Sequence, residues 1–427
     1  MKGTLRLSTC RHGFGLAATS RRLVALVALS LAFATASWSQ TQNYGVIYSF
    51  CGQANDGENP HGDLIADNAG NLYGTTRWGG AYATAETYGY GTVYEIAATG
   101  TETVLHSFAG PPTDGSGPLA GLVRDAAGNL YGTTESGGTY DLGTVFEVSA
   151  DGTETVLYSF TGLGDQANPL GNLLVDPSGN LYGTAVADET GQYGAAFKLS
   201  PRGKMTELHT FTGPPDDGDY PESGLIRDDA SNLYGTTGGG GTFGRGTVFE
   251  VSKAGAETLL YSFGTCCGSD GSEPTANLVR DASGNLYGST VGGGGYDGFC
   301  DLGEYVGCGT VFKVTPDGQE TVLYAFTGKA DGGNPLCDLV LDPKGNLYGT
   351  ASVGGISNES CAANGVPVCG VVFEVAATGK EKVLHAFGGM PDGEQPYGGL
   401  LRIGNYLYGT TTYGGTYDCG TVYKITP

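Results

Sequence analysis

Short apolar runs of five to seven residues alternate with polar, glycine-rich turns along most of the chain. The runs are rich in Val, Ile, Leu, Tyr, Phe and Thr and are bounded by Gly, Asp, Asn or Pro, a composition typical of β-strands. No segment after residue 36 shows the 3.6-residue period of an amphipathic helix. The pattern therefore predicts an all-β protein.

The runs belong to four motifs that recur in one order, each seven times. They are an aromatic run that ends in Phe, a short apolar run, a Leu-Tyr-Gly-Thr run and a Gly-Thr-Val-Phe run. The tyrosine of the third motif recurs at Tyr73, Tyr131, Tyr182, Tyr234, Tyr287, Tyr348 and Tyr408. The turns carry Asp as an acceptor for turn amides and Gly for positive φ, so consecutive runs are expected to pair as an antiparallel meander.

The two ends of the repeat array complement each other. The last copy stops at its Gly-Thr-Val run, residues 421–425, and lacks an aromatic strand, whereas a spare aromatic strand stands at residues 45–50. If the spare strand completes the last copy, all strands are used and no sheet edge stays exposed. The sequence thus predicts one seven-bladed β-propeller over residues 44–427, with four antiparallel strands per blade, closed by the N-terminal strand joining the last blade.

The repeat consensus, LYGTT…GG…GTVFEV…TVLYSF…DG…P, resembles the GloVer tandem repeat of extracellular bacterial proteins and covers nearly all of residues 44–427. Its spacing is also similar to that of NHL-type propellers, in which the run equivalent to residues 122–125 lines the central channel. The resemblance implies an extracellular repeat protein and no defined activity. Anchored members of the family carry a C-terminal tail. This chain ends at Pro427 without one, so we expect a released or non-covalently held protein.

The N-terminal segment has the pattern of a secretory signal peptide. Arg21 and Arg22 precede an apolar run at residues 23–36, which ends in the small residues Ala34-Thr35-Ala36. This run is shorter than the ~20 residues that a membrane-spanning helix needs, and no later run is longer. We therefore predict a signal peptide at residues 1–36, a short leader at 37–43, a secreted location that is extracellular or periplasmic, and no membrane span in the mature chain.

The mature chain is strongly acidic. Residues 1–36 contain five of the 21 Lys and Arg and none of the 44 Asp and Glu, so their removal changes the net charge from −23 to −28. Such a field repels nucleic acid and anionic membranes and favours neutral ligands or cations. The same acidity also keeps a secreted protein soluble, and we expect a monomer.

The cysteines support ring closure in an oxidising compartment. Cys51 directly follows the spare strand and Cys419 directly precedes the last strand, so antiparallel pairing would bring the two within disulfide reach. Two further pairs, each eight residues apart in one loop, are predicted as local disulfides: Cys300 with Cys308, and Cys361 with Cys369. The pairing of Cys266, Cys267 and Cys337 stays open.

Meander topology places the long, variable loops, those after the aromatic strands and after the tyrosine strands, on one face. We call it the long-loop face and expect ligands there.

In every copy an aspartate on this face stands four residues before a proline: Asp56, Asp114, Asp165, Asp217, Asp270, Asp331 and Asp392. These carboxylates could hold calcium together with loop carbonyls, or each could cap an Asp-Gly turn. Strict repetition favours the turn role, because a binding site usually breaks symmetry.

Aromatic residues beside the Gly-Gly pairs of the long loops are candidates for stacking on sugar rings. They are Trp78, Tyr140, Phe243, Tyr296 and Tyr417. The alternative is that these rings pack the loops onto the tops of the blades.

Catalytic signals are weak. His106, His209 and His385 replace the tyrosine of the aromatic strand, which indicates a role in blade packing, and His61 stands in a long loop without a nucleophile beside it. The inner strands look nearly interchangeable, so we assign no catalytic residue and expect no cofactor other than calcium.

The sequence favours a secreted, non-catalytic binding or scaffold module for a glycan or protein. The alternative is a metal-dependent propeller hydrolase, lactonase or lyase, which needs polar residues unique to one or two blades at the channel mouth.

Overall fold

The computed structural model describes residues 43–427 except 85–86, 163–164, 187–192, 265–268, 296–299, 301–306, 357–360, 364–365 and 368. The chain divides into two compact units, Met1–Thr41 and Gln42–Pro427. The predicted signal peptide and all of the leader except Asn43 lie outside the described residues. In the described part of the chain, no helix is long and apolar enough to span a membrane.

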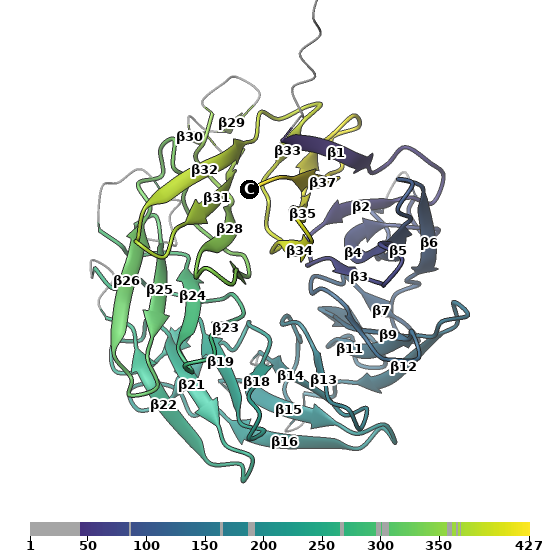
Figure 1. Cartoon of the computed structure of the whole chain (residues 1–427). Helices are drawn as coiled ribbons and strands as arrows, with labels where there is room; N and C mark the ends of the chain where they lie inside the picture. The colour runs from purple at the N-terminus through teal and green to yellow at the C-terminus, as the bar shows by residue number, and fades with distance from the viewer. Residues whose placement is uncertain are drawn as a thin grey trace, which may run out of the picture. The chain divides into compact units, whose positions relative to one another are not determined.

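Seven antiparallel blades stand around a central channel (Figure 1), and each has four main strands that follow one another outwards in sequence order, except that the N-terminal strand is the outermost strand of the last blade. The innermost strands are β3 (Ile65–Ala66), β8 (Val123–Arg124), β13 (Leu174–Val175), β18 (Ile226–Arg227), β23 (Val279–Arg280), β27 (Val340–Leu341) and β34 (Leu401–Ile403). The second strands are β4 (Leu72–Gly79), β9 (Leu130–Thr134), β14 (Leu181–Ala185), β19 (Leu233–Thr237), β24 (Leu286–Thr290), β28 (Leu347–Ala351) and β35 (Tyr406–Thr411).

The outer half of each blade repeats as regularly. The third strands are β5 (Thr92–Ile96), β11 (Thr144–Val148), β15 (Ala195–Leu199), β21 (Thr247–Val251), β25 (Thr310–Val314), β31 (Val371–Val375) and β37 (Thr421–Ile425). The outermost strands are β6 (Glu102–Ser107), β12 (Glu154–Ser159), β16 (Met205–Thr210), β22 (Glu257–Ser262), β26 (Glu320–Ala325), β32 (Glu381–Ala386) and β1 (Tyr44–Ser49). We number the blades 1 to 7 in the order of their inner strands. The predicted all-β, seven-bladed propeller is confirmed.

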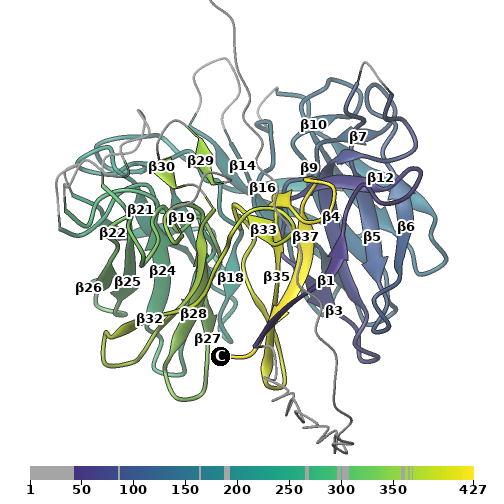
Figure 2. The ribbon, with the colours of Figure 1, turned by 90° about the horizontal axis from the view of Figure 1, so that it is seen from above.

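Short extra strands extend some blades at the long-loop face. They are β2 (Gly57–Pro60), β7 (Gly115–Ser116), β10 (Ser136–Gly137), β17 (Gly218–Asp219), β20 (Gly239–Gly240), β29 (Ala362–Ala363), β30 (Val366–Pro367), β33 (Gly393–Glu394) and β36 (Tyr413–Gly414). In Figure 2, β7, β10, β29 and β30 lie at the same end of the ring, opposite the C-terminus.

Strand β1 closes the ring in blade 7. It pairs antiparallel with β37, from Tyr44 opposite Ile425 to Ser49 opposite Thr421. The predicted disulfide between Cys51 and Cys419 forms beside this pair, with a Cα–Cα distance of 6.0 Å. The other two predicted disulfides are confirmed as well: Cys300 with Cys308, and Cys361 with Cys369. Cys337 is a buried free thiol, and Cys266 and Cys267 lie outside the described residues.

Aromatic contacts join each blade to the next. The phenylalanine after each outermost strand packs edge-on against the aromatic ring of the third strand in the following blade, as Phe108 does against Phe146 with ring centroids 5.0 Å apart. Phe50 of blade 7 packs in the same way on Tyr94 of blade 1, also at 5.0 Å. All four rings are fully buried. Edge-to-face aromatic pairs add about 0.5–1.5 kcal/mol each beyond burial, so these contacts stabilise the closed ring.

The first threonine of the Leu-Tyr-Gly-Thr motif fixes the channel wall. Its hydroxyl donates to a backbone carbonyl just before the inner strand of the next blade, as Thr75 does to Ala120 at 2.8 Å. The equivalent pairs are Thr184 with Ser223, Thr236 with Ala276, Ser289 with Cys337, Thr350 with Gly398 and Thr410 with Gly62. Only the hydroxyl of Thr133, among the described residues at this position, finds no partner. These bonds explain the hydroxyl at this position in six of the seven copies.

Candidate functional site

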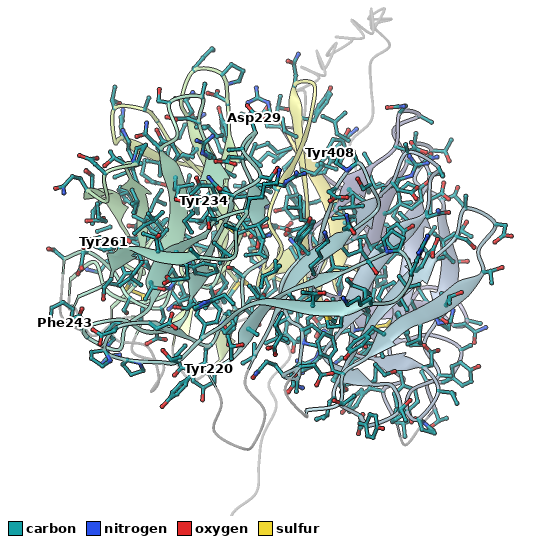
Figure 3. All side chains as sticks on the ribbon, turned by 90° about the horizontal axis from the view of Figure 1, so that it is seen from below. Tyr220, Asp229, Tyr234, Phe243, Tyr261 and Tyr408 are labelled. Carbon is teal, nitrogen blue, oxygen red and sulfur yellow. A yellow bond between two sulfur atoms is a disulfide. The ribbon has the colours of Figure 1, made fainter. Side chains whose placement is uncertain are left out.

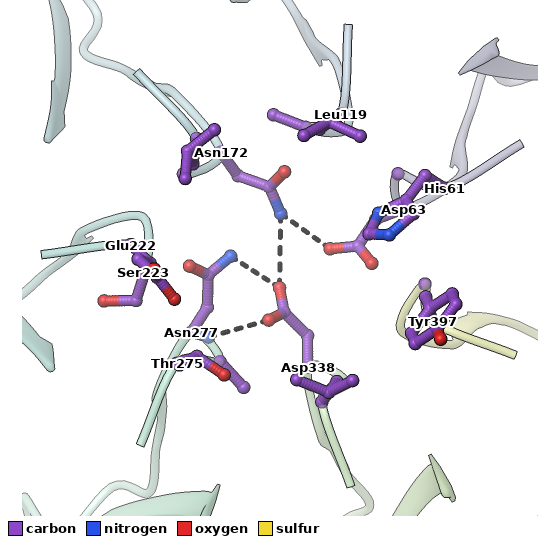
Figure 4. Close-up of a pocket in the computed structure, with 17 residues that line it drawn as sticks. His61, Asp63, Leu119, Asn172, Glu222, Ser223, Thr275, Asn277, Asp338 and Tyr397 are labelled. Atoms are coloured by element: carbon purple, nitrogen blue, oxygen red, sulfur yellow. Dashed lines mark hydrogen bonds between the residues drawn. The ribbon is translucent and has the colours of Figure 1, made fainter. Parts of the chain in front are cut away.

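A cavity of about 270 Å³ opens at the mouth of the central channel (Figure 4). Every blade contributes to its wall, which places the cavity on the axis of the propeller. The lining residues follow the proline that precedes each inner strand. The long loop holds one end of each lining segment, and the inner strand holds the other.

The side chains that point at the axis differ between blades. Three residues after each proline, the blades carry, in order, Asp63, Gly121, Asn172, Gly224, Asn277, Asp338 and Gly399. We call this set the axial ring. The leucine that follows it is the same in all seven blades. Four polar residues and three glycines therefore break the symmetry at one position of an otherwise regular repeat.

Hydrogen bonds connect the polar members of the axial ring across the channel. Asn172 donates from Nδ2 to Asp63 Oδ2 at 2.6 Å and to Asp338 Oδ2 at 3.2 Å. Asn277 donates its backbone N–H to Asp338 Oδ1 at 2.7 Å and its side-chain amide to the other carboxylate oxygen. Figure 4 shows these four side chains converging from four different blades.

Backbone groups fix which way the two asparagines point. The N–H of Gly121 donates to Asn172 Oδ1 at 2.6 Å, and the N–H of Gly224 donates to Asn277 Oδ1. Because both carbonyl oxygens accept from the preceding blade, both NH₂ groups face the carboxylates. The axis thus presents amide donors and carboxylate acceptors side by side.

The three glycines of the axial ring lie so close to neighbouring atoms that a side chain there would clash. A Cβ at Gly224 would lie 2.4 Å from the backbone carbonyl oxygen of Asn172, and a Cβ at Gly399 would lie 2.7 Å from the Cβ of Asp338. The backbone N–H of Gly399 also donates to Asp63 Oδ1. Contacts this short are not tolerated, so these two ring positions require glycine.

The carboxyl groups of Asp63 and Asp338 lie close together on the axis of the propeller. Burial raises the pKa of Asp338 well above its ordinary value, and the nearby charge of Asp63, together with a hydrogen bond between the two carboxyls, raises it further. Carboxyls placed this closely cannot both ionise without repulsion. The pair therefore retains a proton at pH values where an isolated aspartate is ionised.

The rim of the cavity combines an aromatic pair with an acid. His61 stacks on Tyr397, with centroids 4.9 Å apart and ring planes 15° apart. Burial, and secondarily the charge of Arg77, lowers the pKa of His61 to about 4, so its imidazole is neutral at neutral pH. On another side of the cavity, burial and the charge of Glu273 raise the pKa of Glu222.

The predicted aspartates are each engaged in a local turn. Asp56 accepts hydrogen bonds from the N–H groups of Gly52 and Gly57, at 3.0 and 2.8 Å, and from the hydroxyl of Tyr48 at 2.8 Å. The other six receive comparable donors: Asp114, Asp165, Asp217, Asp270, Asp331 and Asp392. One such aspartate belongs to each blade, and the fold does not gather them into one site. Calcium binding at these residues stays a prediction.

The predicted stacking residues are also distributed over several blades. The side chains of Tyr140, Phe243 and Tyr417 are 59%, 57% and 54% exposed, at equivalent loop positions of blades 2, 4 and 7. Trp78 is half-buried under the guanidinium of Arg77, 5.0 Å from the ring. Tyr296 lies outside the described residues. Figure 3 shows Phe243 at one end of the propeller and Asp229 of the same blade at the other.

Sequence reasoning missed the axial ring, although its signal is visible. Aligning Pro169-Leu170-Gly171-Asn172 with the corresponding Pro221-Glu222-Ser223-Gly224 shows polar and small residues exchanged just before the inner strand. The axial ring lies two residues before each inner strand, so the expectation that the inner strands are nearly interchangeable does not extend to it.

The closed ring of blades and the axial cavity together define a β-propeller with a candidate ligand site at its channel mouth. The chain belongs to the Gloeobacter/Verrucomicrobia repeat family, whose model matches residues 81–300 and 298–427. This match confirms the resemblance found in the repeat consensus. A search of curated proteins found no match to the sequence.

Solved structures with the same fold are distant in sequence. The extracellular domain of a candidate hybrid two-component system from B. thetaiotaomicron is 11% identical, with a TM-score of 0.55, over 89% of this chain and 39% of that one. This chain thus spans well under half the length of that relative. A gluconolactonase from Xanthomonas campestris is 17% identical, with a TM-score of 0.43, over 72% of this chain and 86% of that one. The similarity to the extracellular domain concerns the fold alone.

Proposed function

We propose that this protein is an extracellular binding module that captures a glycan at its axial cavity without transforming it. The axial ring is the observation that carries the proposal. A repeat that conserves its strands, turns and threonines in every blade departs from symmetry at the one position whose side chains meet on the axis. Close packing at the axis accounts for the three glycines, and the choice of two aspartates and two asparagines at the other four positions is the feature that we assign to ligand binding.

The chemistry of the cavity suits a neutral, hydroxyl-rich ligand. Hydroxyl groups both donate and accept, and the axis offers the Asn172 amide as a donor beside the Asp63 and Asp338 carboxylates as acceptors. The stacked pair of His61 and Tyr397 adds a flat apolar rim. The overall net charge of −23 opposes anionic ligands.

The size of the cavity favours the end of a glycan. Its volume of about 270 Å³ lies just below the ~300–1,000 Å³ of most small-molecule sites. Further sugar units would extend outwards over the long-loop face, where Tyr140, Phe243 and Tyr417 expose their rings. Three disulfides are typical of proteins that fold in an oxidising compartment, which supports an extracellular setting.

Binding to a glycan array, followed by thermal melting with the selected sugar, tests the proposal. A sugar at 100 times its Kd should stabilise the protein by about 2.7 kcal/mol. Asn172→Ala should abolish this shift, because it removes the donor that lies between both carboxylates. Tyr140→Ala is the matched control on the same face and should change the shift only for longer glycans.

Two results would contradict the proposal. One is the absence of binding to any glycan. The other is a glycan shift that survives Asn172→Ala and Asp63→Asn in folded variants but is lost in Tyr140→Ala, which would move the site to the loops. A protein partner would be indicated if the loop variants alone changed its affinity.

The paired carboxylates favour a second candidate, a metal-dependent hydrolase, lactonase or lyase. Calcium takes 6–8 oxygen ligands. The axis offers carboxylate oxygens of Asp63 and Asp338, but Asn172 and Asn277 turn their NH₂ groups inwards because their oxygens accept backbone N–H groups. This donor set does not fit the ion, which is why we place binding first. Turnover of a lactone or glycan panel that depends on Asp338 and on a divalent cation would reverse the ranking.

A further inference from the structure

Histidine replaces tyrosine at one position of three outermost strands, and each histidine contacts an aspartate. His106 Nε2 lies 3.1 Å from Asp114 Oδ2, and His209 Nε2 lies 3.2 Å from Asp217 Oδ2. At these two places a glutamate from the outermost strand of the next blade completes a group of three, Glu154 and Glu257. We call the groups His106–Asp114–Glu154 and His209–Asp217–Glu257 the inter-blade triads.

The spacing of each triad is close to that of a metal centre. In each, one nitrogen and two carboxylate oxygens lie within 4.8 Å of one another. Tetrahedral Zn²⁺ with bonds of about 2.0–2.1 Å separates its ligand atoms by about 3.3 Å. The His106–Asp114 distance of 3.1 Å already matches this edge, and only the glutamate has to approach.

The glutamate of each triad has an unpaired oxygen, as do Glu102, Glu320 and Glu381 at the equivalent position outside the triads. Glu154 Oε1 and Glu257 Oε1 are buried and accept no hydrogen bond from any described residue. Glu154 faces the negative charge of Asp114, and Glu257 faces that of Asp217. A buried acceptor without a partner costs about 1–3 kcal/mol. A cation between the two carboxylates and the imidazole would satisfy this oxygen and neutralise the repulsion.

The aspartates are held ready for such a role. Asp114 accepts the N–H groups of Ala109 and Gly115, at 2.8 and 2.6 Å. Hydrogen bonds of this kind orient metal ligands and raise their affinity. The side chains of His106 and Asp114 are 19% and 10% exposed, so an ion can enter from solvent.

We propose that each inter-blade triad binds one Zn²⁺ through the histidine Nε2, an aspartate oxygen and the glutamate Oε1, with water as the fourth ligand. The two ions link blade 1 to blade 2 and blade 3 to blade 4. A set with one imidazole and two carboxylates suits zinc and not calcium, which takes oxygen ligands only. This site is separate from the axial cavity, and neither proposal depends on the other.

The third histidine provides a control within the same chain. His385 Nε2 lies 3.0 Å from Asp392 Oδ2. Here Tyr44 of β1 takes the place of the glutamate and stacks on the imidazole, with centroids 3.7 Å apart. Because only two ligands remain, His385 should not contribute a zinc site.

Equilibrium dialysis of the metal-free protein against micromolar Zn²⁺ tests the proposal. We expect two equivalents of zinc for the wild type, one for His106→Tyr, one for His209→Tyr, none for the double variant and two for His385→Tyr. Tyrosine is native at this position in four other blades, so these variants should fold, which circular dichroism checks. Glu154→Gln should weaken one site by about 10–100-fold.

A thermal melt gives a second readout. Zinc, but not calcium, should raise the melting temperature of the wild type and of His385→Tyr, and should leave the double variant unchanged. The proposal is overturned if the wild type takes up no zinc, or if the stoichiometry is the same in the double variant, which would assign the metal to other residues such as the cysteines.

Discussion

Asn172 Nδ2 lies 2.6 Å from Asp63 Oδ2, although the two residues belong to blades 1 and 3. No side chain intervenes because blade 2 contributes Gly121 to the axial ring. The axial side chains are therefore fixed by one another as well as by their own blades. A ligand that enters must exchange hydrogen bonds with this network, so any change in one member should alter the others.

Replacing Asp63 should change the pH dependence of stability. The pKa of Asp338 is raised in the folded protein by burial and by Asp63. A raised pKa contributes stability that is present below the unfolded value and is lost as pH rises through the folded value. Asp63→Asn removes the neighbouring charge, so its melting temperature should fall less than that of the wild type between pH 4 and pH 8, by roughly 1–2 °C. Parallel curves would contradict this account, and the exposed Asp229→Asn is the control.

The contribution of the inter-blade threonine hydrogen bonds to stability should be measurable, because Thr133 lacks such a bond and serves as an internal control. Thr75→Val removes the 2.8 Å bond to the carbonyl of Ala120 and should cost about 1–2 kcal/mol of unfolding free energy. Thr133→Val removes a buried hydroxyl without a described partner and should be neutral or slightly stabilising. Urea denaturation compares the two. Equal losses would mean that the shape of the side chain matters and the hydrogen bond does not.

Glutamates at the starts of the outermost strands should make the protein less stable as pH rises. Burial, followed by the charge of an aspartate in the preceding blade, raises the pKa of Glu102, Glu320 and Glu381 to about 7. Their protonated forms stabilise the fold below about pH 4.5, and this contribution disappears as pH rises through 7. These side chains are partly exposed, so each effect is small, about 1 °C in melting temperature.

The triple variant Glu102→Gln/Glu320→Gln/Glu381→Gln tests that account by melting at pH 5 and pH 8. Its decrease between the two should be about 3 °C smaller than that of the wild type, because distant sites add. Glu95→Gln, which lies in blade 1 like Glu102, serves as the control. An unchanged decrease in the triple variant would show that other groups govern the pH dependence.

The disulfide across the ring closure should matter more than a local one. The Cys51–Cys419 bond spans 368 residues, whereas Cys361–Cys369 spans eight. In the chain-entropy model the first contributes about 6 kcal/mol and the second about 2–3 kcal/mol. Replacing both cysteines of each pair by serine and comparing melting temperatures tests the difference. A local bond that proved the more important would indicate that blade 7 stays closed through β1 alone.

The fold could be predicted because its determinants are local and repeated. Strand composition, turn residues and the spare strand at residues 45–50 each point to the same closed ring, and the position of Cys51 beside that strand confirms its partner. Because the motifs occur seven times, an irregular residue in one copy does not obscure the pattern. A site that depends on differences between copies is overlooked for the same reason.

The candidate site could not be predicted for this reason. Asp63 and Asp338 lie far apart in the sequence and belong to a segment outside all four motifs. Their proximity follows from convergence at the axis, which depends on how far each blade reaches inwards. Likewise, His106 reads as a packing residue, because its partner Glu154 belongs to the next blade. Only the assembled ring brings such residues together.

The number of blades limits how side chains and glycines can alternate around the axial ring. Side chains and glycines alternate around most of the ring, and an even number of blades could continue this alternation around the whole of it. Seven is odd, so one neighbouring pair must carry two residues of the same kind, and here that pair is Asn277 and Asp338, which both carry side chains. This unavoidable mismatch gives the mouth of the channel a fixed orientation around its axis. A propeller with this blade number can thus distinguish one edge of a ligand from another, even though its scaffold is nearly the same in every direction.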